Sequence, residues 1–114
     1  MATINCTMVV QPDNVMVVAW NDITEADTGR GVQMARYPDR TVQVTGDFTT
    51  SGSVLIEGSN DGTNYNTLTD PTGATLVFTA AGIKLIVENP LYIRPRATAG
   101  TAVAMDVVIV GAPR

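Results

Sequence analysis

Gly52 to Thr69 reads Gly-Ser-Val-Leu-Ile-Glu-Gly-Ser-Asn-Asp-Gly-Thr-Asn-Tyr-Asn-Thr-Leu-Thr, and this stretch decides the fold class. Its apolar run Val54-Leu55-Ile56 meets turn-forming residues from Gly58 to Gly62, and a second strand-like run follows. Asn, Asp and Gly adopt positive φ at little cost, as a hairpin turn requires. The stretch therefore predicts a β-hairpin with strands at Ser53–Glu57 and Tyr65–Thr69.

The same pattern continues on both sides of this hairpin. Turn residues recur about every eight to twelve positions, which is the spacing of an antiparallel sandwich or barrel. Gly82–Glu88 is ambiguous between a strand and a helical turn, and Pro95 belongs on an edge or at a bulge because it cannot donate to a ladder. Further strands are expected at Thr3–Val10, Val15–Asn21, Thr41–Gly46, Ala74–Thr79, Leu91–Thr98 and Val103–Val110, with a loop at Thr24–Gly31 and a turn at Asp70–Gly73.

Alternation within the predicted strands fixes which side chains face inward. Val42 and Val44 share one face, and Val103, Met105, Val107 and Ile109 share another. The fold class is therefore all-β: a single antiparallel β-sandwich, jelly-roll or immunoglobulin-like, with no long helix. Residues 1–114 form one domain with an N-terminal arm of about residues 1–10. Its core is built from Val, Ile and Leu, with Phe78 among its largest members.

Composition excludes several classes of function. The 114 residues carry a net charge of −4, with Lys84 the single lysine, which argues against nucleic acid as a partner. No apolar run approaches the ~20 residues of a membrane span, and no secretory signal is visible. We therefore expect no membrane contact and synthesis in the cytoplasm. One cysteine, Cys6, permits no intrachain disulfide, and we expect a free, buried thiol.

The sequence offers no complete catalytic or metal-binding constellation. There is no histidine, the usual general base and zinc ligand. Asp27-Thr28-Gly29 matches the triplet of dimeric aspartic proteases, but it lies in a polar loop, where nothing raises the pKa of the carboxyl group. Asn60–Asn64 has too few carboxylates for a calcium loop and fits a turn better. We expect no enzyme activity, no cofactor and no metal.

Arginine and aromatic residues point instead to protein–protein contact. Six of the seven basic residues are arginines, whose planar fork pairs with carboxylates and is enriched in interfaces. Trp20 is of a type found at binding hot spots, but it suits the core equally well. The candidate interface residues are Trp20, Arg30, Met34, Arg36, Tyr37 and Arg40.

From Tyr37 to the C-terminus, the order of motifs resembles small virion proteins of tailed bacteriophages, in particular capsid decoration (cement) proteins. The motifs are Thr41-Val42-Gln43-Val44-Thr45-Gly46, Val54 to Tyr65 of the hairpin, Leu68-Thr69-Asp70 and Tyr92-Ile93-Arg94-Pro95, followed by the closing Val/Ile strand. The resemblance implies an all-β module that binds neighbouring subunits of an assembled shell together. It carries no catalytic residues.

The resemblance implies a structural protein on the capsid surface of a virion, with the major capsid protein as its partner. Gly-Ser-Asn-Asp-Gly also occurs in carbohydrate-binding sandwiches, so a glycan-binding module of a tail fibre or adhesin is the alternative.

A small decoration module gains avidity when its copies group around a symmetry axis. We therefore expect a homo-oligomer, most simply a trimer. The arm Ala2–Val10 would reach a neighbouring copy, and the loop from Thr24 to Arg40 would face the shell or that copy. Deleting residues 2–10 should then lower capsid occupancy and leave the sandwich folded.

Overall fold

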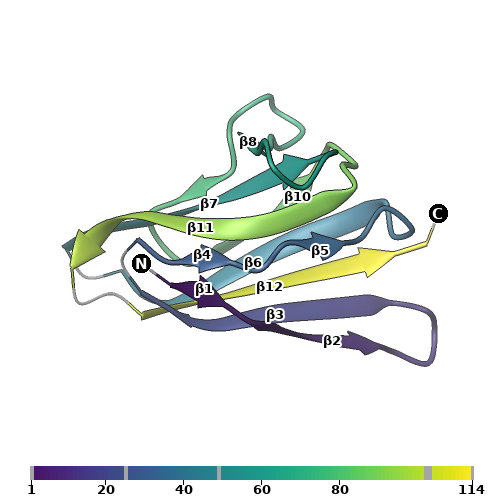
Figure 1. Cartoon of the computed structure of the whole chain (residues 1–114), viewed down its shortest axis with the longest axis horizontal. Helices are drawn as coiled ribbons and strands as arrows, with labels where there is room; N and C mark the ends of the chain where they lie inside the picture. Colours follow the sequence, from purple (N-terminus) through teal and green to yellow (C-terminus); the bar gives the residue numbers. More distant parts are fainter. Residues whose placement is uncertain (1, 25, 49, 102–103, 114) are drawn as a thin grey trace.

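The computed structural model describes residues 2–24, 26–48, 50–101 and 104–113. All regular structure in these residues is β-strand, and none of it is helical, so the predicted all-β class is confirmed (Figure 1). The strands are β1 (Thr3–Ile4), β2 (Cys6–Val10), β3 (Met16–Ile23), β4 (Thr28–Gly29), β5 (Val32–Gln33), β6 (Asp39–Asp47), β7 (Thr50–Ser59), β8 (Asn66–Thr67), β9 (Val77–Phe78), β10 (Gly82–Ile86), β11 (Tyr92–Thr101) and β12 (Ala104–Ala112).

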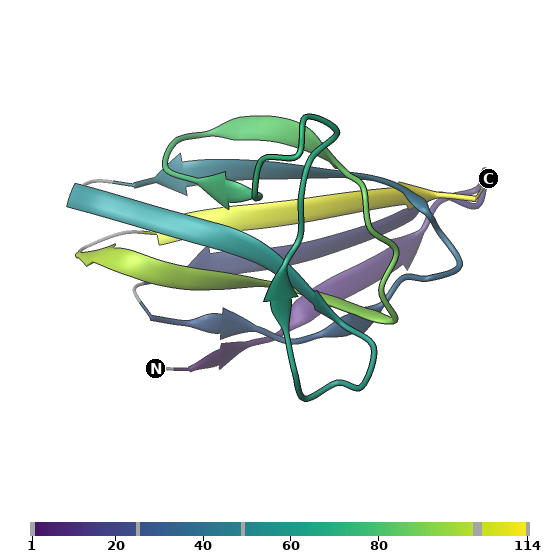
Figure 2. The same ribbon diagram turned by 90° about the horizontal axis from the view of Figure 1, so that it is seen from above.

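The strands form two sheets that pack face to face as a sandwich. Sheet A has the order β1-β4-β11-β7-β8, with β5 also pairing β11 and β9 also pairing β7. Sheet B has the order β10-β6-β12-β3-β2. Neighbouring strands are antiparallel except for the short parallel pair of β1 and β4. Seen from above, β7 and β11 lie across the strands of sheet B (Figure 2).

The strand pairs are nested in the sequence, and this nesting distinguishes a jelly roll from an immunoglobulin-like sandwich. The hairpin of β7 and β8 is innermost, enclosed by the pair β6–β10, then by β4 and β5 with β11, and finally by β3–β12. Successive pairs alternate between sheets A and B, as in a double Greek key. The predicted hairpin within Gly52–Thr69 therefore forms the innermost pair of strands, β7 and β8.

Alternate residues of the long strands fill the space between the sheets. In β6, Val42 and Val44 are buried, and in β12 so are Met105, Val107 and Ile109, as predicted. Val103 lies outside the described residues. Phe78 is buried, which confirms its place in the core. The other core residues are Val18, Trp20, Ile23, Val32, Met34, Val54, Ile56, Leu68, Leu76, Ile86, Ile93 and Ala97.

The N-terminal segment contributes to both sheets. Thr3 and Ile4 pair with β4 in sheet A, and β2 pairs with β3 in sheet B, so the chain crosses between the sheets at Asn5. The single strand expected at Thr3–Val10 is thus two strands. Because both strands pair within the chain, residues 2–10 do not form a detached arm, and β2 lies at the edge of sheet B.

Two ambiguous segments take definite forms. Gly82–Ile86 is a strand, β10, at the edge of sheet B beside β6. Pro95 lies in β11 opposite an irregularity in the pairing with β4 and β5. On either side of it, Arg96 pairs with Thr28 and Ile93 pairs with Val32. Between these two pairs, the segment from β4 to β5 has one more residue than β11. An extra residue of this kind is a β-bulge, and it lies where the missing N–H of Pro95 requires one.

Candidate functional site

The structure divides the six predicted interface residues into two groups. Trp20, Met34 and Arg40 have no exposed surface, so the expectation that they present themselves to a partner is corrected. Trp20 in β3 and Arg40 in β6 occupy inward-facing positions, which adjacent strands and the opposite sheet cover. The remaining three, Arg30, Arg36 and Tyr37, reach the surface, Tyr37 only partly. Their role in an interface stays a prediction.

Trp20 fixes the segment that carries Arg30. Its indole Nε1 donates a hydrogen bond of 3.0 Å to the carbonyl oxygen of Arg30, and a buried indole N–H normally requires such a partner. The ring also lies against Gly29, where an added Cβ would come within 2.9 Å of it. A core side chain therefore positions a surface arginine, and the sequence left both readings of Trp20 open.

Asp27 is a structural anchor of the loop between β3 and β4. Its carboxylate accepts hydrogen bonds from the Thr24 hydroxyl at 2.6 Å, the Thr24 amide at 3.0 Å and the Ala2 amide at 3.0 Å. The Thr24 hydroxyl and these two amides lower the pKa of Asp27 although burial acts against them. The residue is 6% exposed, so the solvated position expected from the sequence is wrong, whereas the expectation that its pKa is not raised is confirmed.

Arg40 is a buried cation with incomplete hydrogen bonding. Its Nη2 donates to the carbonyl oxygen of Glu88, while Nε and Nη1 have no hydrogen-bond partner among the described residues. Burial lowers the pKa of Arg40, and the nearby Glu88 carboxylate opposes this effect. Burial raises the pKa of Glu88, but hydrogen bonds from Thr69 and the charge of Arg40 outweigh it and lower the pKa overall. The two groups form a charge-compensated pair at the end of the sandwich.

The outer face of sheet A carries an arginine cluster, which we define as Glu57, Arg94, Arg96 and Tyr65. Arg94 Nε lies 2.7 Å and Arg96 Nε 3.3 Å from the Glu57 carboxylate, which is almost fully buried. The guanidinium carbon of Arg94 lies 3.6 Å from the centre of the Tyr65 ring, within cation–π range. The cluster carries one net positive charge in a chain of net charge −4, which suits it to an acidic partner.

Arg94 and Arg96 are not among the interface residues predicted from the sequence. Residues two apart on a strand share a face, so the spacing Arg-Pro-Arg within a predicted strand was the signal that could have placed both on one surface. Glu57 lies on the neighbouring strand opposite Arg94, a pairing that spacing within one strand does not indicate.

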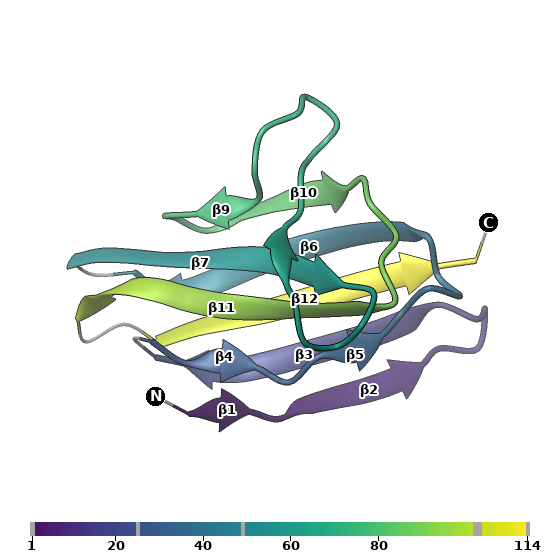
Figure 3. The same cartoon turned by 45° about the horizontal axis from the view of Figure 1, so that its top comes forward.

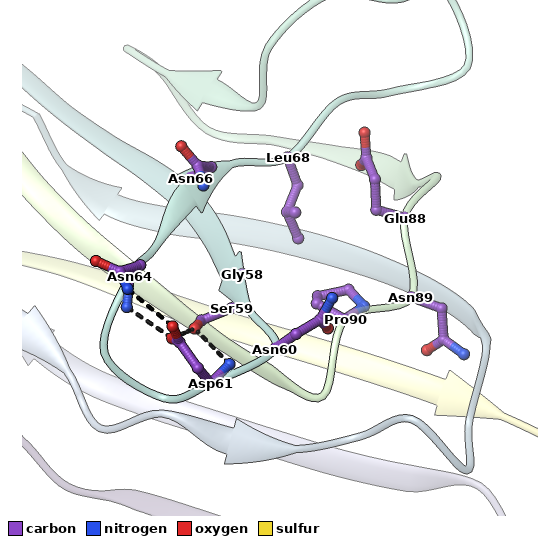
Figure 4. Close-up of a pocket in the computed structure, with 10 residues that line it drawn as sticks. All are labelled: Gly58, Ser59, Asn60, Asp61, Asn64, Asn66, Leu68, Glu88, Asn89 and Pro90. Carbon is purple, nitrogen blue, oxygen red and sulfur yellow. Dashed lines mark hydrogen bonds between the residues drawn. The ribbon is translucent and has the colours of Figure 1, made fainter.

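The loop after β7 is held in shape by Asp61. Its carboxylate accepts hydrogen bonds from the amide and side chain of Asn64 and from the Ser59 hydroxyl (Figure 4), and also from the amide of Thr63. The two amides have the largest effect and, with the side-chain donors, hold the pKa of Asp61 far below its usual range. The acceptor capacity of this carboxylate is used within the loop, as expected for a turn rather than for a calcium ligand.

Between this loop and the segment after β10 lies a shallow pocket of about 550 Å³. Its lining includes four side-chain amides and, between them, the apolar side chains of Leu68 and Pro90 (Figure 4). Three of the amides are committed, since Asn60 accepts from the Leu91 amide, Asn89 donates to the Ala35 carbonyl oxygen and Asn64 donates to the Asp61 carboxylate. The pocket can offer hydrogen bonds to a polar ligand. The four amides belong to Asn60, Asn64, Asn66 and Asn89.

Neither a metal-ligand cluster nor a membrane-spanning helix is found in the part of the chain that the structure describes. No three side chains of the His, Cys, Asp and Glu type gather there in an arrangement that could hold a metal ion. No helix long and apolar enough to cross a membrane occurs there either.

Comparison with known proteins gives likeness in fold alone. No family model matches the chain, and no curated protein is similar enough in sequence to count as a relative. Among solved structures, the SPBc2 prophage-derived protein YomS superimposes with a TM-score of 0.61 at 12% identity, over 92% of this chain and 100% of that one. This likeness shows a fold shared with a prophage-derived protein.

Two further solved structures are less similar to this chain than YomS is. The cysteine peptidase Peruvianin-I from Thevetia peruviana latex has a TM-score of 0.48 at 12% identity, over 96% of this chain and 61% of that one. An RmlC-like cupin from Methanocaldococcus jannaschii has a TM-score of 0.48 at 11% identity, over 95% and 78%.

Proposed function

We propose that this chain is a structural protein of a tailed-bacteriophage virion that decorates the capsid and stabilises it through protein–protein contacts. The observation that carries the proposal is the likeness in fold to a prophage-derived protein, which this chain matches over that protein's full length. The motif order from Tyr37 onward, which resembles capsid decoration proteins, supports the same class. The partners are the major capsid protein and further copies of this chain, and neither nucleic acid nor a membrane takes part.

The arrangement of charged side chains supports contact with an acidic protein surface. The arginine cluster and the exposed Arg36 and Arg30 present guanidinium groups on a chain whose net charge is negative. Both arginines of the cluster, Arg94 and Arg96, are held in place by Glu57. Less side-chain freedom is therefore lost when they bind a carboxylate of a partner. In this proposal the chain is not an enzyme, and its polar residues serve structure and recognition.

The proposal is tested by binding to the shell. The purified chain is mixed with capsids of the phage that encodes it, stripped of this protein, and the fraction that sediments with the shells is measured. We expect saturable binding, at least ~10-fold weaker for Arg36→Glu, because a reversed charge faces the acidic partner. Thr45→Ala, at an exposed position of β6, is the control and should bind like the unmodified chain. Absence of the protein from both shells and intact virions would exclude the proposal.

One observation favours the alternative, a glycan-binding module: the pocket lined by Asn side chains offers the hydrogen bonds that sugars use. The positions of the aromatic residues argue against a glycan-binding function, because sugar rings stack on aromatic faces that are free. Trp20 is buried and one face of Tyr65 is covered by Arg94. A glycan array separates the two functions: a specific hit lost in Asn66→Ala, without shell binding, would favour the module.

A further inference from the structure

Strand β2 is an edge strand without the features that normally prevent association. It ends sheet B, lies at the margin of the molecule in two views (Figures 1 and 3), and reads Cys-Thr-Met-Val-Val, with no charge and no proline. Met8, Val9 and Val10 are 57%, 53% and 51% exposed. The opposite edge strand, β10, carries Lys84 at its centre. Long apolar edges without such a charge pair readily with another strand.

The hydrogen-bonding groups that β2 leaves open can be identified. The amide of Gln11 donates to the carbonyl oxygen of Val15, so this pair occupies a hydrogen-bonded position of the ladder between β2 and β3. In an antiparallel ladder, bonded and non-bonded pairs alternate. Thr7 and Val9 therefore bond to β3, and the N–H and C=O groups of Cys6, Met8 and Val10 point away from the sheet.

We propose that two copies of this chain pair through β2, antiparallel and across a two-fold axis at Met8, which joins the two B sheets into one. In this register Met8 lies opposite Met8 of the second copy, and Cys6 lies opposite Val10 of the second copy. These are the residues whose backbone groups are open, so each pair exchanges two N–H···O bonds. No charged side chain of either strand faces another, which leaves the pairing self-complementary.

A groove beside β2 provides room for the side chains that meet at this axis. It has a volume of about 540 Å³ and is lined on one side by Cys6, Met8 and Met16 and on the other by Gly31 and Val32. Cys6, Met8 and Val10 share the face of sheet B that carries the buried Val18 and Trp20. Pairing therefore continues an apolar inner face across the axis, where the thioether of Met8 from each copy can adapt to the space.

The charges at the two ends of β2 favour a second copy as the occupant. Arg30 lies at the start of the strand: its amide donates to the Ile4 carbonyl oxygen, and burial raises the pKa of Cys6 although the nearby charge of Arg30 acts against it. Asp13 lies in the exposed turn at the other end. Antiparallel pairing brings the start of one strand to the end of the other, so each Arg30 approaches Asp13 of the second copy. A two-fold axis gives this complementarity twice.

The pairing should be weak and concentration-dependent. A five-residue edge buries less than the ~800 Å² per partner of a standard interface. The inference is independent of the proposed function, and it gives a two-fold pair where avidity alone suggested a trimer.

A disulfide tests the register directly. In Val10→Cys, the new thiol lies opposite Cys6 of the second copy at a Cα separation of about 5.5 Å, within the range for a disulfide. Under mild oxidation with oxidised glutathione, we expect a covalent dimer on a non-reducing gel. The matched control is Val9→Cys, which faces the other side of the sheet opposite Thr7 and should remain uncrosslinked. A Val10→Cys chain that stays uncrosslinked, or equal crosslinking in both variants, would overturn the register.

Sedimentation equilibrium tests the pair without cysteine chemistry. The unmodified chain should approach twice its 12.0 kDa mass as concentration rises. Met8→Lys places two like charges at the axis and should weaken association by at least ~10-fold. Ile83→Lys, at an equally exposed apolar position of β10, should leave it unchanged. Monomer at all concentrations, or the same loss in both variants, would overturn the proposal.

Discussion

Single polar residues with little or partial exposure determine how the ends of this sandwich are held. Asp27 and Glu88 each accept several hydrogen bonds from one threonine, a hydroxyl and an amide in each case. Arg40 is different, because a guanidinium offers five donors and two of its nitrogens have no hydrogen-bond partner in the described structure. The carboxylates of Asp27 and Glu88 are stabilised by hydrogen bonds from their neighbours, whereas the hydrogen bonding of the buried Arg40 is incomplete.

Arg40→Met is therefore expected to leave the free energy of unfolding unchanged or to raise it by about 1 kcal/mol, because a well-packed apolar side chain often replaces a buried charge without loss. Urea unfolding followed by circular dichroism measures the change. Arg40→Ala is the comparison: it leaves a cavity and should destabilise by about 2–4 kcal/mol. A large loss of stability in Arg40→Met would show that the hydrogen bond to Glu88 and the charge pair dominate.

Glu57→Gln is expected to lower the free energy of unfolding by about 1–2 kcal/mol. The substitution leaves Arg94 and Arg96 without their shared carboxylate, but both arginines keep some contact with water, which reduces the penalty of a broken buried pair. Urea unfolding in low and high salt checks this. Added salt screens the ion pairs, so it should reduce the difference in free energy of unfolding between the unmodified chain and the variant. Gln43→Ala on β6 serves as the control, with a change below about 0.5 kcal/mol.

At the scale of strands, the bulge between β4 and β5 depends on a close contact. Gly29 lies against the ring of Pro95 and the indole of Trp20, and an added Cβ would come within 2.6 Å of Pro95. Neither ring can move far, because Trp20 is buried and donates to Arg30. Because glycine has no side chain, β4 can lie close to both Pro95 in β11 and Trp20 at the point where the pairing register shifts.

Gly29→Ala should destabilise the protein by about 1–3 kcal/mol, the usual cost of overpacking. Gly82→Ala is a matched control in β10, since an added Cβ there would meet only Phe78 at 3.7 Å, an ordinary contact. Thermal unfolding of both variants gives the comparison. Equal melting temperatures would mean that β4 moves away from Pro95 at little cost.

Strand positions could be predicted from the sequence to the extent that alternation marks them. The burial of Val42 and Val44, and of Met105 and Val107, can be predicted because one polar residue separates the members of each pair, Gln43 in the first and Asp106 in the second. The crossing at Asn5 has no such mark, since its cause is the choice of partners, β4 before it and β3 after it. Partner choice depends on residues far away in the chain.

The burial of the candidate site residues could not be predicted for a related reason. Trp20, Met34 and Arg40 have side chains that suit an interface as well as a core, and only the opposite sheet decides between them. Arg94 and Arg96 could have been recognised from their spacing. What remained out of reach was Glu57 between them, because its pairing requires the register of β7 and β11.

For the whole molecule, the titration of carboxylates sets the response to acid. The pKa values of Asp27, Asp61, Asp70 and Glu88 all lie below their ordinary values of 3.8 for Asp and 4.5 for Glu. As the pH falls, the unfolded chain binds protons first, so stability present above about pH 5 is lost as the pH falls through the folded-state values.

We expect the free energy of unfolding to be nearly constant between pH 6 and 8, where a chain without histidine titrates little, and to fall steadily below pH 4.5. Urea unfolding at a series of pH values measures this. In Asp27→Asn the free energy of unfolding should be lower at pH 7 than in the unmodified chain, and it should fall less steeply as the pH decreases. An unchanged slope in this variant would mean that Asp27 contributes nothing to the acid response.

The nested pairing also determines at which stage of synthesis the core can fold. β12 lies between β6 and β3 at the centre of sheet B, yet it follows every other strand in the chain. While the chain emerges from the ribosome, the two halves of sheet B lack the strand that joins them, so the core can close only after residue 112 has been released. Chains truncated before Ala104 should accordingly show no cooperative unfolding in urea, and a cooperative transition in them would show that the other strands close a core by themselves.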